Sequence, residues 1–288
     1  MKKLLKGIFV CGVLLAVGPL NASAKEQALD YVSIPSYDLR SNVIRNTQNE
    51  FPMNTVEQQL YDQYNLLTPN YLLNVKEAIF DGNVTSLEGV QFFKNLEIFG
   101  ENEGYLGVDP RNLSENTKLK ELSVNSTFYS IEFLRELKSL KKINIENNAN
   151  ANYDYHEEKN KSILPIFDLT VLNDLNQLEE VNINTIGYMP AIVQRKEKST
   201  YTIANPVFLS NQFIEEEEDE DGNVIGTKQS PVDFSSINEN FSFKEDELTW
   251  TNLTPDVKEL RFQWSANAEY QGQHFSVRGE SIIPVVWK

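Results

Sequence analysis

A spaced pattern of apolar residues recurs between residues 75 and 186. Each copy has an apolar residue, two variable positions, a second apolar residue, one variable position and a third apolar residue, as in Leu140, Ile143 and Ile145. The copies begin at residues 75, 96, 119, 140 and 178, so the first three periods are 21, 23 and 21 residues long. This spacing and period predict leucine-rich repeats, in which each copy supplies one short strand to a stacked array.

The second half of each copy is predicted to return along the other side of the array in tight 3₁₀ turns. Apolar residues recur there at every third position, as at Ile131, Leu134 and Leu137, and residues three apart share one face of a 3₁₀ helix. Asn83 and Asn148 follow two of the strands, where a side-chain amide is expected to satisfy buried turn backbone groups.

Two copies depart from the pattern. Glu101 stands where the second copy requires an apolar residue, so that copy is expected to be irregular. The last period, from residue 140 to residue 178, is 38 residues long, and its excess lies within 149–164, around Tyr153, Tyr155 and His156. Insertions in repeat arrays form loops, often at a binding face, so a protruding loop is predicted here.

The first 24 residues have the pattern of a secretory signal. Three lysines precede an apolar stretch over residues 8–20, and the small residues 22–24 follow it, which predicts cleavage after Ala24. A transmembrane anchor is the alternative, but a span needs about 20 apolar residues, and this stretch is shorter. Lipid attachment at Cys11 is disfavoured because no small residues precede it. The mature chain is therefore expected to be secreted and extracellular, without a stable membrane anchor.

Residues 25–74 are predicted to form a lead-in and a helical cap. Their first half is polar without a clear period and is expected to be extended. Asn54, with Glu57 three residues later, has the capping-box pattern, and Thr68 followed by Pro69 marks the start of a second short helix. A repeat array exposes its first apolar layer to water, so these helices are expected to cover it.

From about residue 200 the apolar period changes to two, as at Leu260, Phe262 and Trp264. Asp221 and Gly222, at the end of an acidic run, are a strong hairpin signal, and several short strands predict an immunoglobulin-like sandwich packed on the last repeat. The predicted fold is an α/β leucine-rich repeat solenoid with a helical N-terminal cap and a C-terminal all-β immunoglobulin-like sandwich. Its parts are residues 1–24 (signal peptide), 25–74 (lead-in and helical cap), 75–199 (about five leucine-rich repeats, with an insertion near 149–164) and 200–288 (immunoglobulin-like module).

Charge and cysteine content narrow the chemistry. The formal charge is −16, and loss of the three signal lysines makes it −19. Such acidity disfavours nucleic acid and anionic membranes as partners and favours encounter with basic ones. The single cysteine lies in the signal, so the mature chain is expected to have no disulfide and no thiol chemistry.

Motifs for catalysis or metal binding are missing from the sequence. The two histidines, His156 and His274, lie far apart, and neither G-x-S-x-G nor H-E-x-x-H is present. The acidic run over 215–221 resembles a calcium loop weakly, because the later bidentate glutamate is missing, and a solvated hairpin is the preferred interpretation. The sequence therefore predicts no enzyme, with no catalytic, cofactor-binding or metal-binding residues.

Four strings resemble the internalin family of Gram-positive bacteria. Residues 87–96 and 119–124 resemble internalin repeats, and residues 247–250 and 275–279 resemble the module that follows them. The resemblance runs from about residue 50 to the C-terminus, and it implies that the concave repeat face binds a host protein without chemistry or cofactor. Because no sorting motif or basic wall-binding repeat follows, the chain is similar to the small, freely secreted internalins. Its repeats are fewer and less regular than usual, so no particular receptor is implied.

Alternation along each strand points the residues between the apolar ones outward, onto the concave face. The protein is expected to be a monomer that binds a host protein at this face. Its role would be in adhesion or virulence. The alternative is a bacterial envelope-binding or structural surface protein, and plain solvation also requires a polar open face. The candidate partner-binding residues are Glu77, Ile79, Ile98, Glu121, Ser123, Asn125, Lys142, Asn144, Glu146, Glu180, Asn182 and Asn184 on the strands, and Tyr153 and Tyr155 on the insertion.

Overall fold

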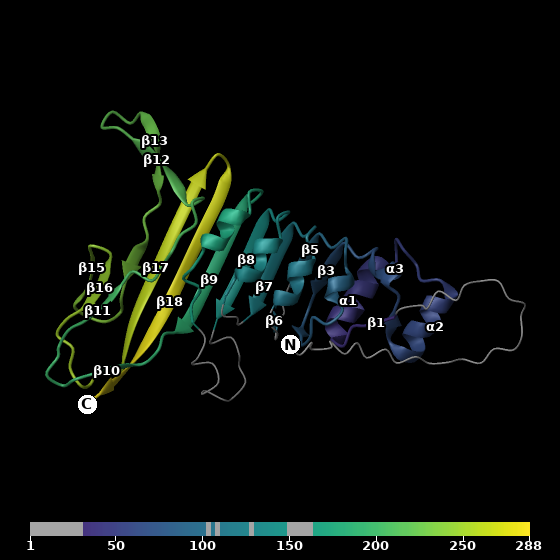
Figure 1. Cartoon of the computed structure of the whole chain (residues 1–288), viewed down its shortest axis with the longest axis horizontal. Coiled ribbons are helices and arrows are strands. Elements are labelled where there is room, and N and C mark those ends of the chain that lie inside the picture. The colour runs from purple at the N-terminus through teal and green to yellow at the C-terminus, as the bar shows by residue number, and fades with distance from the viewer. Residues whose placement is uncertain (1–30, 102–104, 107–109, 127–129, 149–163) are drawn as a thin grey trace, which may run out of the picture. The chain divides into compact units, whose positions relative to one another are not determined.

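A computed structural model describes residues 31–101, 105–106, 110–126, 130–148 and 164–288, which are mostly β structure with few helices (Figure 1). The expected signal peptide and the insertion with Tyr153 and Tyr155 lie outside the described residues. Within those residues, no helix is long and apolar enough to span a bilayer.

The five predicted copies each supply one strand to a single parallel array. Neighbouring strands pair in sequence order, and a short parallel pair continues the first two copies. This arrangement is compatible with leucine-rich repeats. The strands are β3 (Glu77–Phe80), β4 (Asn83–Val84), β5 (Ile98–Glu101), β6 (Tyr105–Leu106), β7 (Glu121–Ser126), β8 (Lys142–Asn148) and β9 (Glu180–Tyr188).

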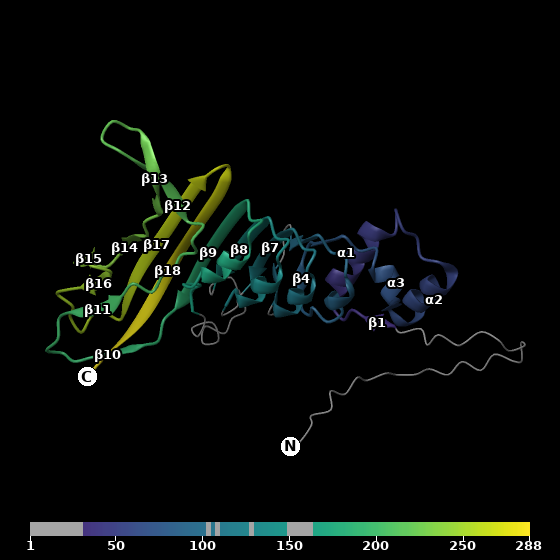
Figure 2. The same ribbon diagram turned by 45° about the horizontal axis from the view of Figure 1, so that its top comes forward.

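One face of each strand forms the core, as the pattern predicts. Phe99 on β5, Ile145 on β8 and Ile183 on β9 are fully buried at inward positions of their strands. Alternate side chains of a strand lie on opposite faces, so these positions face the core. The predicted 3₁₀ turns are also confirmed, and they follow one another beside the strands (Figure 2). These turns are η1 (Val90–Phe92), η2 (Pro110–Glu115), η3 (Glu132–Glu136) and η5 (Thr170–Asp174).

Buried polar side chains link the repeats, but at positions other than the predicted ones. The side chains of Asn83 and Asn148 lie outside the described part of the structure. Asn116, before the third strand and 1% exposed, donates its amide to the carbonyl oxygens of Val90 and Phe93 at 3.0 Å each. The backbone N–H groups of Phe93 and Leu96 also donate to these two oxygens. The Asn116 amide therefore gives each buried carbonyl a second donor and links its own repeat to the turn of the preceding one.

The N-terminal segment corrects the expectation of an extended lead-in. It forms helix α1, which buries Leu39, Val43 and Ile44 and packs on β3. The amphipathic spacing of these three residues outweighs the polar composition around them. The helix that covers the first repeat strand is therefore α1. The elements before the repeats are β1 (Val32–Ser33), α1 (Tyr37–Thr47), α2 (Thr55–Tyr64), β2 (Leu66–Leu67) and α3 (Pro69–Leu72).

Both predicted helix starts are confirmed. Asn54 accepts hydrogen bonds from the backbone N–H groups of Val56 and Glu57, and the Glu57 carboxylate accepts from the Asn54 N–H. Thr68 caps α3 by accepting from the Tyr71 N–H at 3.1 Å. Nonetheless α2 buries no residue, so it contributes little to the core.

The C-terminal strands continue the sheet of the repeats. Strand β18 pairs in parallel with β9, and β17 pairs antiparallel with β18 on its other side (Figure 1). The sequence predicts a sandwich that packs on the last repeat. In the structure, β18 instead pairs with the free edge of the last repeat strand, β9. These strands are β10 (Ile192–Gln194), β14 (Asp233–Ser235), β17 (Glu259–Tyr270) and β18 (Gln273–Trp287).

A second, three-stranded sheet packs against β14 and β17 through aromatic side chains. Trp250 is fully buried, with its ring 5.2 Å from Phe241 and 6.0 Å from Phe262. The predicted hairpin at Asp221–Gly222 is confirmed as a separate antiparallel pair. These elements are β11 (Tyr201–Ala204), β12 (Ile214–Glu218), β13 (Val224–Gln229), β15 (Phe241–Lys244) and β16 (Glu247–Trp250).

Candidate functional site: the polar face of the sheet

The register of the strands aligns their outward side chains in three rows that run across the sheet. We call the surface that these three rows form the polar face. The first row is Glu77, Ile98, Glu121, Lys142, Glu180, His274 and Glu269. The second row is Ile79, Gly100, Ser123, Asn144, Asn182, Ser276 and Asn267. The third row is Asn125, Glu146, Asn184, Arg278, Ser265 and Asp233.

All twelve candidate residues on the strands lie in these rows. Alternation alone places them there, because the predicted apolar positions occupy the opposite face. The rows continue onto β18 and β17, whose residues are not among the candidates predicted from the sequence. Alternation at Phe275 and Val277 could have indicated that His274, Ser276 and Arg278 face outward, but the pairing of β18 with β9 has no local signal.

A hollow of about 350 Å³ lies in the polar face over Gly100. Ile79, Ile98, Glu121, Ser123, Lys142, Asn144 and Glu180 contribute to its lining. A Cβ atom at Gly100 would lie 3.3 Å from the Cβ of Ser123, so glycine leaves this floor open. Seven of the candidate residues therefore surround one depression, where a partner side chain has room.

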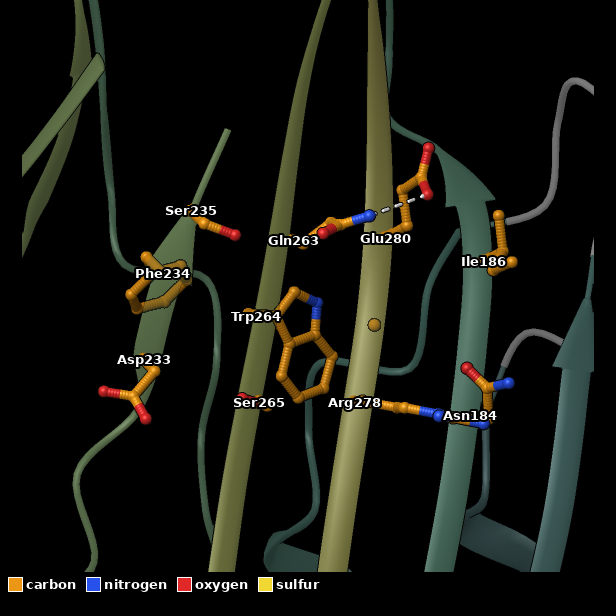
Figure 3. Close-up of a pocket in the computed structure, with 11 residues that line it drawn as sticks. Asn184, Ile186, Asp233, Phe234, Ser235, Gln263, Trp264, Ser265, Arg278 and Glu280 are labelled. Carbon is orange, nitrogen blue, oxygen red and sulfur yellow. Dashed lines mark hydrogen bonds between the residues drawn. The ribbon is translucent and has the colours of Figure 1, made fainter. Parts of the chain in front are cut away.

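A second hollow, of about 440 Å³, lies at the other end of the face, where β9 meets β18, β17 and β14 (Figure 3). Arg278 extends toward Asn184 in this view, and the Gln263 amide donates to Glu280 at 3.3 Å. Arg278 forms no hydrogen bond or ion pair with the described residues. Within the part of the chain that the structure describes, this end of the face thus offers a guanidinium without a side-chain partner beside polar groups.

Carboxylates outnumber cations on the polar face. Lys142 lies 3.8 Å from Glu180, and His274 lies 3.6 Å from Glu269, and all four side chains are exposed. Exposed pairs of this kind contribute little to stability. Among the described residues, the side chains of Glu77 and Glu121 have no hydrogen-bond or ion-pair partner, so both carboxylates are available to a partner.

The second copy forms a regular strand, contrary to the irregularity expected from Glu101. Glu101 occupies the half-buried inward position after Phe99 on β5, and its Oε2 atom has no hydrogen-bond partner among the described atoms. Burial raises the pKa of Glu101 to about 7, against a smaller lowering by a hydrogen bond from the Asn125 backbone. In the folded state the Glu101 carboxyl is therefore protonated below pH 7 and about half protonated in neutral solution.

Glu101→Gln is expected to remove a pH dependence of stability. The unfolded chain releases this proton near 4.5 and the folded chain near 7; the folded state therefore binds more protons, and stability falls as pH rises between these values. At pH 8 the variant is expected to be more stable than the wild type by about 1 kcal/mol, after allowance for partial exposure. Urea unfolding at pH 5 and pH 8 measures this, with exposed Glu121→Gln as the control; equal pH slopes for Glu101→Gln and the wild type would contradict it.

The described residues contain no group of three or more His, Cys, Asp or Glu side chains arranged to hold a metal ion. In the acidic hairpin, Asp219 accepts hydrogen bonds from the backbone N–H groups of Asn223 and Asp221 at 2.8 and 3.0 Å. These bonds, those from Asn223 first, lower the pKa of Asp219. The carboxylate therefore closes the turn.

The fold presents an open polar sheet face, and its parallel array is compatible with leucine-rich repeats. No protein-family model matches the sequence, and no curated protein is significantly similar to it. Among solved structures, the chain is similar to the functional domain of InlJ from Listeria monocytogenes, with 13% identity and a TM-score of 0.42 over 75% of this chain and 44% of that one. It is also similar to the internalin InlF of the same species, with 20% identity and a TM-score of 0.34 over 52% and 43%.

A further similar structure is internalin C2 of Listeria monocytogenes, at 15% identity and a TM-score of 0.24 over 55% of this chain and 77% of that one. The chain spans less than half of the length of the InlJ and InlF structures. These similarities concern the fold and do not extend to a partner or an activity.

Proposed function

We propose that this chain is a secreted leucine-rich repeat solenoid, completed by an immunoglobulin-like sandwich, that binds a protein of a host cell through the polar face. The observation that carries the proposal is the register that aligns twelve candidate residues on one open sheet face, seven of them around the hollow over Gly100. An open array of short strands offers a wide surface without a closed reaction site, which suits binding rather than catalysis. The protein acts by adhesion and needs no cofactor.

Reversal of charge on the polar face is expected to weaken partner capture at least tenfold. Glu121→Lys with Glu146→Lys places cations on the first and third rows, where an oppositely charged partner would be repelled. The matched control, Glu88→Lys with Glu136→Lys, makes the same change of charge at exposed positions in the turns, away from this face. Host-cell lysate passed over immobilised wild type and both variants, with quantitative mass spectrometry, identifies proteins lost only from the polar-face variant.

Three other outcomes would change the proposal. Proteins retained equally by wild type and polar-face variant would place binding elsewhere. Capture of bacterial envelope material, with none from host lysate, would favour the alternative role at the bacterial surface. N-terminal sequencing of secreted product tests the cleavage, and a start other than Lys25 would move that boundary.

A further inference from the structure

Carboxylates stand on every second strand of the first row. The strands between them carry an apolar, a cationic and a titratable residue, namely Ile98, Lys142 and His274. The order therefore alternates across seven neighbouring strands, from β3 in the first repeat to β17 in the C-terminal hairpin. The carboxylates are Glu77, Glu121, Glu180 and Glu269.

The strand spacing fixes the period of this charge pattern. Neighbouring strands lie about 4.8 Å apart, so carboxylate positions repeat about every 9.6 Å across the sheet. A polyproline II segment rises 3.1 Å per residue with three residues per turn, so every third residue returns to the same side after about 9.3 Å. Over three periods the positions of the carboxylates and of every third residue of the segment differ by about 1 Å in total. For an α-helix, two turns span about 10.8 Å, so over three periods the corresponding difference is about 3.6 Å.

The second row provides a floor for such a segment. Its side chains between β5 and β17 are short and neutral, and a chain crossing the strands meets the hollow over Gly100 on the way. The Asn182 side chain is exposed and makes no hydrogen bond to the described residues. A polyproline II backbone has no internal hydrogen bonds, so its carbonyl groups can accept from amides of this row.

We infer that the polar face receives a basic, proline-rich segment of a partner protein, which crosses the strands as a polyproline II helix with lysine or arginine at every third residue. Each cation then faces one carboxylate of the first row, and the segment extends from the repeats onto β18 and β17. This inference rests on the proposed function and names the chemistry of its partner.

Two peptides of identical composition test the inference on the full chain. In Lys-Pro-Pro repeated four times, all lysines share one side of the polyproline II helix. In the isomer Lys-Pro-Lys-Pro-Lys-Pro-Lys-Pro-Pro-Pro-Pro-Pro, lysines every second residue point to all three sides. Fluorescence anisotropy of labelled peptides in 50 mM NaCl is expected to show at least tenfold tighter binding of the first, weakened in 300 mM NaCl.

Neutral variants locate the binding. Glu121→Gln with Glu180→Gln removes two of the four carboxylates and is expected to weaken the first peptide at least tenfold, whereas Glu88→Gln with Glu136→Gln is expected to leave it unchanged. Equal affinity of the two peptides, equal loss in both variants, or no binding would overturn the inference. If the peptide fails while charge reversal still abolishes capture of a host protein, the proposed function stands and only the polyproline II partner is wrong.

Discussion

Replacing Gly279 with valine is expected to destabilise the protein by about 3 kcal/mol, the upper range for overpacking of a core. Register places Gly279 beside Trp264 on β17 and beside Thr185 on β9. A Cβ atom there would lie 2.4 Å from both Cε2 and Nε1 of Trp264. Trp264 is 2% exposed, with its ring 6.1 Å from that of Phe167, so moving it away from a new side chain would disturb buried packing.

Gly226 supplies the matched control, because it lies in the exposed strand β13 with its nearest neighbour, Oε2 of Glu217, 4.0 Å from a Cβ position. Gly226→Val is expected to change stability by less than about 0.5 kcal/mol. Urea unfolding, followed by tryptophan fluorescence and by circular dichroism, measures both variants. Equal stability of the two would contradict the pairing of Gly279 with Trp264, and with it the junction between the repeats and the C-terminal strands.

Replacing Asn116 with alanine is expected to destabilise the protein by about 2 kcal/mol, because two buried carbonyl oxygens each lose one of their two hydrogen-bond donors. Those oxygens belong to Val90 and Phe93, and no water can readily replace an amide that is 1% exposed. Asn116 links two repeats, so the loss of stability is expected in the unfolding of the repeat array.

Asn95 offers a comparison of the same chemistry in water. Its amide also donates to a backbone carbonyl, that of Leu73 at the end of α3, at 2.7 Å, but at an exposed position. Asn95→Ala is therefore expected to cost less than about 1 kcal/mol, since solvent can satisfy the carbonyl. Thermal unfolding of both variants gives the comparison, and an equal loss for the two would show that burial at Asn116 has no special weight.

Local patterns in the sequence predict the repeat strands, their 3₁₀ turns and the two helix starts. These features depend on short-range physics, since a core-facing strand needs alternation and a helix start needs a cap. Helix α1 had a signal too, because Leu39, Val43 and Ile44 recur at helical spacing. The polar residues around them, including the buried Asn42, made this apolar helix face difficult to recognise in the sequence.

The extent of the candidate site depends on long-range pairing and could not be predicted in the same way. Alternation placed Glu121 and Asn182 on the outward face, but it also fitted β18 either as a strand of a separate sandwich or as the next strand of the array. Val277, opposite Ile183, belongs to the same buried layer as the repeats. Only that pairing brings His274 and Arg278 beside the predicted residues.

The central claim is that the repeats and the C-terminal hairpin share one polar face in a fixed register. A disulfide between Asn182→Cys and Ser276→Cys, in a chain with Cys11→Ser, tests it most directly. These positions are in-register neighbours on β9 and β18, about 4.8 Å apart, which a disulfide can bridge. The control pair, Asn182→Cys with Asn267→Cys, has β18 between its strands and lies about 9.6 Å apart, which is too far. Rapid oxidation of the first pair alone is the expected result, and failure of the first pair, or equal oxidation of both, would contradict the continuous face.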